Sequence, residues 1–169
     1  FYTFSAWRTG RPALAYVGLP FLLAAFADLV WGLDVPTYDM GRWLVYFGVL
    51  TAAASVWRVR PISAPLAVTG MSAIAAGLVW SAGAYAMNPE ALRSLVSSLI
   101  AAGLFGLAAS FHTRKPLPAA LGLPLLAVAG HFMLVYEGAR LELYAPYYGL
   151  MAATVGLCTV TSRRHAPFL

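Results

Sequence analysis

The sequence predicts an all-α integral membrane protein whose six transmembrane helices form three parallel-repeat helical hairpins. Three observations support this class: an apolar composition, six apolar stretches of membrane-spanning length, and an alternation of basic and acidic loops. Hydrophobic residues make up 61% of the 169 residues and charged residues 10%, whereas soluble domains have about 45–50% and about 25%. A soluble domain of this size needs more surface charge, so we expect lipid to surround most of the chain.

The apolar stretches that we expect to span the membrane are, in chain order, 12–33, 41–57, 62–86, 91–111, 117–136 and 143–161. A helix crosses the roughly 30 Å of hydrocarbon with about 20 residues, so the second and sixth stretches are close to the minimum length. Helices are expected throughout, because strands of this length would leave backbone groups unpaired in lipid.

The connections between these stretches are short and contain residues that begin helices. Asn88, Pro89 and Glu90 precede the fourth span. They supply an N-cap side chain, a proline whose missing N–H costs nothing there, and an acid near the positive end of the helix dipole. Asp39 is expected to cap the second span in the same way.

The distribution of charge predicts the orientation. One side of the membrane would hold eight basic residues and no acidic residue: Arg8, Arg11, Arg58, Arg60, Arg114, Lys115, Arg163 and Arg164. The other side would hold three arginines and most of the acids: Arg42, Arg93, Arg140, Asp34, Asp39, Glu90, Glu137 and Glu142. Because loops rich in basic residues remain on the inner side of a membrane, both termini are expected in the cytoplasm. The membrane is expected to be the bacterial cytoplasmic membrane. Aromatic residues such as Trp31, Trp80 and Tyr136 would mark the outer interface.

A repeated pattern divides the single membrane domain, residues 1–169, into hairpin units at about 11–59, 60–114 and 115–164. Each unit begins with a basic residue and a proline and reaches Leu-Val-aromatic 19, 19 and 20 residues after that proline. The first and third units also share Gly-Leu-Pro, at Gly18–Pro20 and Gly122–Pro124. We therefore expect parallel repeats in a six-helix bundle with approximate threefold symmetry. In this organisation the chain resembles the HdeD-like membrane proteins, which also look like three short hairpins, and the resemblance implies no function.

Small residues and prolines predict how the spans pack and bend. Stripes of small residues let helices approach closely in lipid, and the expected stripes are Ala102, Gly106 and Ser110, Ser72 with Ala76, and Ala152 with Gly156. Pro20 and Pro124 should each free a carbonyl and bend their helix.

Asp28 and His131 are the main candidates for polar chemistry inside the membrane. They lie 16 and 15 residues after the prolines that begin their spans, so they should occupy similar depths and could face one another. Such a pair could relay protons or bind a cation. The alternative is that Asp28 reaches the outer interface and His131 bonds a backbone carbonyl, and we favour that alternative.

Glu137, Arg140 and Glu142 follow the fifth span and could line a polar outer mouth, although solvated loop charges are the ordinary explanation. Arg42, Arg93 and Arg140 place one cation in each outer loop, so a three-arginine anion site is conceivable. The three arginines follow the aromatic residue of the Leu-Val-aromatic motif at different distances along the sequence, which disfavours such an anion site.

The sequence predicts no catalytic, cofactor-binding or metal-binding residues. Only His131 among the three histidines lies within a span, so a haem held by two histidines of this chain is disfavoured, and zinc has no suitable ligand set. The sequence contains no Gly-x-Ser-x-Gly elbow, no His-Glu-x-x-His motif and no Gly-x-x-x-x-Gly-Lys-Ser/Thr loop. This disfavours a membrane serine protease, a zinc protease and a nucleotide-driven motor. Basic residues flank the spans instead of forming one stripe, which argues against nucleic acid.

These observations favour a non-catalytic accessory, assembly or scaffold subunit of a larger membrane complex. Its expected partners are membrane lipids and either other membrane-protein subunits or further copies of itself. The alternative function is a small transporter or channel that uses Asp28 and His131, and the third is a lipid-modifying membrane enzyme.

Overall fold

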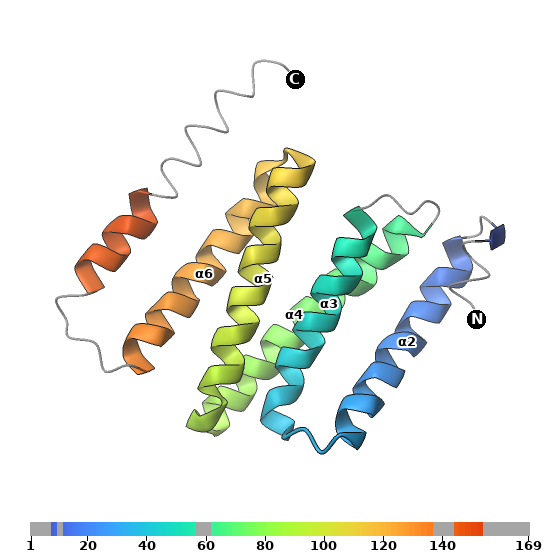
Figure 1. Ribbon diagram of the computed structural model, residues 1–169, viewed down its shortest axis with the longest axis horizontal. Coiled ribbons are helices and arrows are strands. Elements are labelled where there is room, and N and C mark those ends of the chain that lie inside the picture. The colour runs from blue at the N-terminus through green and yellow to red at the C-terminus, as the bar shows by residue number, and fades with distance from the viewer. Residues whose placement is uncertain (1–7, 10–11, 57–61, 137–143, 154–169) are drawn as a thin grey trace.

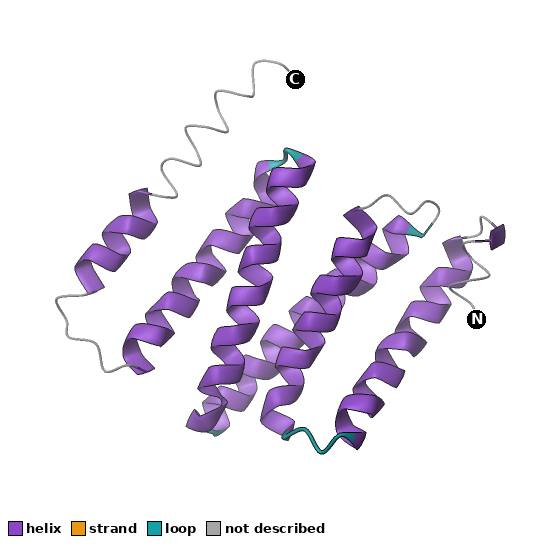
Figure 2. Ribbon diagram, in the orientation of Figure 1, coloured by secondary structure: helices purple, strands orange, loops and turns teal. Residues whose placement is uncertain are grey.

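The computed structural model describes residues 8–9, 12–56, 62–136 and 144–153, and within these residues it contains helices and no strand (Figure 2). The α-helices are α2 (Pro12–Gly32), α3 (Met40–Val56), α4 (Ser63–Met87), α5 (Leu92–Thr113) and α6 (Pro116–Tyr136). Two 3-10 helices, η1 (Thr37–Asp39) and η2 (Pro89–Ala91), precede α3 and α5. Residues 144–153 are also helical.

Four helical stretches are long and apolar enough to cross a membrane: Pro12–Gly32, Ser63–Met87, Pro89–Thr113 and Leu117–Tyr136. The predicted class, an all-α membrane protein, is confirmed to this extent. Helix α3 is described over 17 residues, fewer than the roughly 20 that a straight crossing needs. The expected sixth span is described only over 144–153. The six-span count therefore stays a prediction.

The helices lie side by side, with α2 at one flank and the helix of 144–153 at the other (Figure 1). Helix α3 packs most extensively against α4, and α5 packs most extensively against α6. Helix α2 has more contact with α4 than with α3, its neighbour in sequence. The closest pairs thus join successive hairpin units instead of lying within one unit. The hairpin repeat and its threefold arrangement are not confirmed and stay predictions.

Glycines form the interface between α3 and α4. A Cβ atom added to Gly70 would lie 2.5 Å from the backbone nitrogen of Ala52 and 2.7 Å from the carbonyl oxygen of Gly48. One added to Gly77 would lie 2.6 Å from the carbonyl oxygen of Gly41. Because real Cβ atoms do not approach so closely, only glycine permits this backbone contact. The dispersion attraction gained by close packing stabilises helix association in lipid, where the hydrophobic effect does not act between helices.

The α5–α6 interface is built in the same way. A Cβ atom on Gly106 would lie 2.7 Å from the carbonyl oxygen of Pro118, and one on Gly122 would lie 2.6 Å from that of Gly103. Ala102 is buried on another side of α5, in a cluster with Val45 and Ala52 of α3 and Ile74 of α4. Two residues of the stripe expected on the fourth span therefore lie at helix interfaces, Gly106 against α6 and Ala102 against α3 and α4.

The stripe expected on the third span is wrong, because Ser72 and Ala76 are exposed. Helix α4 instead turns Gly70, Ala73 and Gly77 inward. Both faces of this helix carry small residues at helical spacing, and the face that contains glycine allows the closer approach. Of the pair expected on the sixth span, Ala152 is exposed and Gly156 lies outside the described residues.

Serine hydroxyls join α4 to α5 in the core. The Oγ atoms of Ser81 and Ser98 are 3.0 Å apart, and both residues are completely buried. Ser98 Oγ also donates to the carbonyl oxygen of Ser94 at 2.7 Å. Hydroxyl pairs of this kind add polar attraction between helices that the hydrocarbon cannot provide.

The predicted helix start at Asn88 is confirmed, because its side-chain oxygen accepts a hydrogen bond from the backbone N–H of Glu90 at 2.9 Å. It caps η2, through which the chain enters α5. The expectation for Asp39 is wrong. Asp39 is the last residue of η1, and its carboxylate pairs with Arg42, three residues on, at 3.1 Å.

Helices α2 and α6 run without interruption through Pro20 and Pro124. Both prolines are exposed, so the carbonyl that each leaves without its usual helical partner lies near the surface of the bundle. A bend at either position stays a prediction.

Candidate functional site

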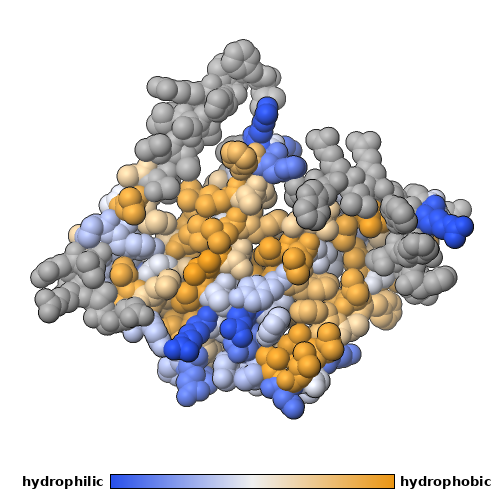
Figure 3. All heavy atoms as spheres, in the orientation of Figure 1, coloured by the Kyte–Doolittle hydropathy of each residue, from blue (hydrophilic) through white to orange (hydrophobic). Residues whose placement is uncertain are grey.

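Polar side chains gather where η1, η2 and the C-terminal end of α6 meet, which we call the cavity end of the bundle. Figure 3 shows hydrophilic side chains along the lower edge of the molecule, beneath a band of hydrophobic residues. A cavity of about 640 Å³ lies there, lined by Tyr38, Asp39, Arg42, Pro89, Glu90, Arg93 and Tyr136. Three stretches far apart in sequence contribute to it, so it depends on the tertiary packing of α3, α5 and α6.

Arg42 stands in the first turn of α3. One terminal nitrogen donates to the carboxylate of Asp39 at 3.1 Å, and the guanidinium lies 5.9 Å from the centroid of the Trp43 ring. The Nε atom is buried and has no hydrogen-bond partner. A buried N–H group of an arginine without a partner is costly, so Arg42 is only partly satisfied by the protein itself.

Arg93 stands on the opposite wall, in the first turn of α5. Its guanidinium donates to the hydroxyl oxygen of Tyr136 at 3.0 Å and lies 5.7 Å from the centroid of that ring. The side chain is exposed. A guanidinium has five N–H donors, so the phenol leaves most of the hydrogen-bonding capacity of Arg93 available.

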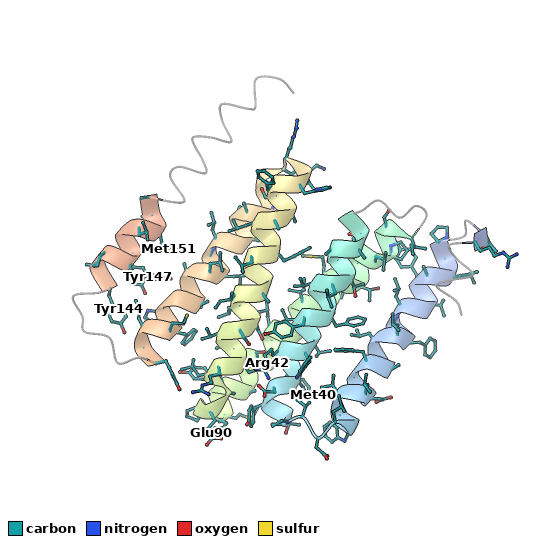
Figure 4. All side chains as sticks on the ribbon, in the orientation of Figure 1. Met40, Arg42, Glu90, Tyr144, Tyr147 and Met151 are labelled. Atoms are coloured by element: carbon teal, nitrogen blue, oxygen red, sulfur yellow. The ribbon has the colours of Figure 1, made fainter. Side chains whose placement is uncertain are left out.

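Glu90 supplies a second carboxylate. The residue is exposed, and among the described residues its carboxylate makes no hydrogen bond or ion pair, since Asn88 engages only its backbone N–H. Figure 4 shows Glu90 at the lower end of α5 and Arg42 near the lower end of α3. The walls thus carry two cations, two anions and two phenols, so the cavity suits a ligand that has charges of both signs.

The structure does not bring Asp28 and His131 together. Asp28 is exposed on α2, whereas His131 is half-buried on α6, on the other side of α3, α4 and α5 (Figure 1). The Nδ1 atom of His131 is 2.7 Å from the hydroxyl of Tyr148. His131 also lies edge-on to Tyr144, at 5.8 Å between ring centroids. Its described polar partner is therefore a tyrosine of residues 144–153.

Tyr147 holds the helix of 144–153 against α6. Its hydroxyl donates to the backbone carbonyls of Ala127 and Leu126, the second at 3.4 Å. The phenol lies directly over Gly130, where a Cβ atom would collide with it. This contact of Tyr147 with α6 was not predicted from the sequence. The signal in the sequence was Gly130, because a glycine within a span leaves room for a large side chain such as this phenol.

The expected outer-mouth residues Glu137, Arg140 and Glu142 lie outside the described residues. Of the three arginines considered for an anion site, Arg42 and Arg93 line the same cavity. Tyr38 and Asp39 were not expected at a site. The sequence contained a signal for them, because this tyrosine and this acid lie immediately before the second span. Their loop is expected on the same side of the membrane as Glu90 and Arg93.

Within the described ranges, no group of three or more histidine, cysteine, aspartate or glutamate residues is placed to hold a metal ion. Compared with known protein families, curated proteins and solved structures, the chain matches none.

Proposed function

We propose that this chain is a non-catalytic accessory, assembly or scaffold subunit that packs in the membrane against other protein subunits or a second copy of itself. The observation that supports it most directly is the unequal packing of the helices. The central helices meet through backbone contacts at glycine, whereas α2 buries only Ala15, Leu19 and Val30. A rigid centre with a lightly attached flank is suited to assembly.

The use of polar groups in the core supports the same function. The buried hydroxyls of Ser81 and Ser98 bond one another, and the described cavities lie at the loops between helices and not along a path through the bundle. The serine hydroxyls are engaged with one another and hold helices together, as expected for a protein whose role is assembly.

The flank formed by α2 is the surface that we expect a partner to cover. Tyr16, Phe21 and Trp31 are exposed on it. On its inner side Ala15 and Leu19 pack near Leu66 of α4, and the ring of Phe26 lies against that of Phe47 on α3. Association in lipid depends on dispersion and close packing. A helix with few internal contacts would gain the most from an external partner.

We also propose that the chain has six spans in the bacterial cytoplasmic membrane, with both termini inside and the cavity end outside. The charge asymmetry of the loops supports this orientation. A cysteine replacing Thr37, in a chain without the native Cys158, should react with an impermeant maleimide added to intact cells. One replacing Arg114 should react only after lysis. The reverse pattern would contradict the orientation.

The subunit role is tested by photo-crosslinking in the native membrane. A photoreactive residue at Phe21 on α2, which is 66% exposed, should yield a protein adduct of one defined mass. The matched control is Val79 on α4, 73% exposed, which should label only lipid. Absence of a protein adduct at Phe21 would contradict the proposal. Solute flux in proteoliposomes that disappears in Asp28→Asn would favour the transporter instead.

A further inference from the structure

We propose that the cavity between η1, η2 and α6 binds the headgroup of a zwitterionic phospholipid, with the phosphate at Arg42 and Arg93 and the ammonium group at Glu90. This goes beyond the proposed function and does not rest on it. The cavity volume of about 640 Å³ accommodates a phosphate and a short amine.

The phosphate position follows from the two arginines. Arg93 bonds a single neutral phenol, and Arg42, whose side chain is partly exposed, donates to Asp39 through one terminal nitrogen. Guanidinium groups bind phosphate oxygens through charge-assisted hydrogen bonds in a planar fork. A phosphate between them would satisfy donors that the described part of the protein leaves unused.

The ammonium position follows from the acids and the rings. Glu90 has an exposed carboxylate with no partner among the described residues, while Asp39 is paired with Arg42. An ammonium group is attracted to a carboxylate and to the face of a phenol ring, and Tyr38 and Tyr136 both line the cavity. An anionic lipid without an amine would leave Glu90 unpaired beside its phosphate.

The position of the cavity favours a lipid over a soluble zwitterion. Its lining includes Pro89 and Tyr136, which are the end residues of two apolar stretches long enough to cross a membrane. Tyr136, the last residue of α6, is 52% exposed there, as expected for an aromatic residue at the headgroup layer. A lipid seated in the cavity keeps its acyl chains on the apolar surface beside it, whereas a soluble molecule gains nothing from that surface.

The test is native mass spectrometry of the full chain in mild detergent, titrated with single lipids. Wild type should bind phosphatidylethanolamine about tenfold more tightly than phosphatidylglycerol, which has the phosphate but no amine, because one charge-assisted contact is worth about that factor. Arg93→Gln should weaken phosphatidylethanolamine binding about tenfold. Arg114→Gln, which removes a charge at the opposite end of α5, is the matched control and should change nothing.

Glu90→Gln separates headgroup recognition from folding, because the side chain is exposed and makes no described contact. It should bring the ratio between the two lipids close to one. Equal binding of both lipids by wild type, or a ratio that Glu90→Gln leaves unchanged, would overturn the proposal. Glycerophosphoethanolamine, the headgroup without acyl chains, should compete only weakly. If it bound as tightly as the lipid, the site would belong to a soluble ligand and the lipid assignment would be wrong.

Discussion

The contact between α3 and α4 at Gly70 gives a quantitative prediction. In Gly70→Ala the new Cβ atom would lie 2.5 Å from the backbone nitrogen of Ala52, whereas ordinary contacts begin at 3.4 Å. The helices must therefore separate by almost an ångström, and overpacking of this kind costs about 1–3 kcal/mol. Because the obstructing atoms belong to a helix backbone, no side-chain rotation can relieve the collision.

Gly83→Ala is the matched control on the same helix, because a Cβ atom there meets nothing within 4 Å. Alanine is favoured over glycine in a helix by about 1 kcal/mol, and this gain is common to both variants. The difference between their free energies of unfolding therefore isolates the steric cost, and we expect Gly70→Ala to be lower by about 1–3 kcal/mol.

The measurement is equilibrium unfolding in mixed micelles with a rising fraction of denaturing detergent, followed by circular dichroism of the helices. Both variants should unfold in one cooperative transition, and the difference is taken between the two fitted free energies. If Gly70→Ala and Gly83→Ala had equal stability, α3 and α4 would not be in backbone contact, and the account of this interface would be refuted.

Three further experiments test individual polar contacts by the same unfolding measurement. A double-mutant cycle of Ser81→Ala and Ser98→Ala should show a coupling of about 0.6 kcal/mol, and strict additivity would mean that the 3.0 Å contact contributes nothing. Trp80→Phe removes the indole donor that lies 2.8 Å from the carbonyl oxygen of Thr37, so stability should fall by about 1 kcal/mol. Tyr147→Phe removes the hydroxyl bonded to carbonyls on α6 and should cost about 1 kcal/mol, a loss that an unchanged unfolding curve would contradict.

The helix boundaries were predictable from the sequence because they depend on local chemistry. The first span was expected to end at 33 and ends at Gly32, and the second was expected to begin at 41 and begins at Met40. Turn residues, prolines and the length of an apolar run decide such boundaries without reference to the rest of the fold. The role of Asn88 was predictable for the same reason, since a cap acts within three residues.

The choice of helix faces was less predictable. Helix α4 has small residues on two faces, and the sequence does not state which face meets another helix. Ser72 and Ala76 were expected at an interface, yet the contact is made by Gly70 and Gly77. In lipid the apolar periodicity that identifies a buried face in water is lost, because every face is hydrophobic.

The candidate site was predicted only in part. Arg42 and Arg93 were considered together because each was expected in an outer loop, but their shared cavity depends on how α3 packs against α5. The pairing of Asp28 with His131 was argued from depth alone. Depth fixes position along the membrane normal and leaves position within the plane undetermined, so residues at equal depth can lie on opposite flanks.

The preference of α2 for α4 affects how the protein is made. Ribosomes add about 5–20 residues each second, and 55 residues separate the end of α2 at Gly32 from the end of α4 at Met87. Helix α2 therefore waits roughly 3 to 11 seconds for its main neighbour to leave the ribosome. During that interval it must remain in the insertion machinery or drift in the bilayer, so this is the stage of synthesis at which misassembly would begin.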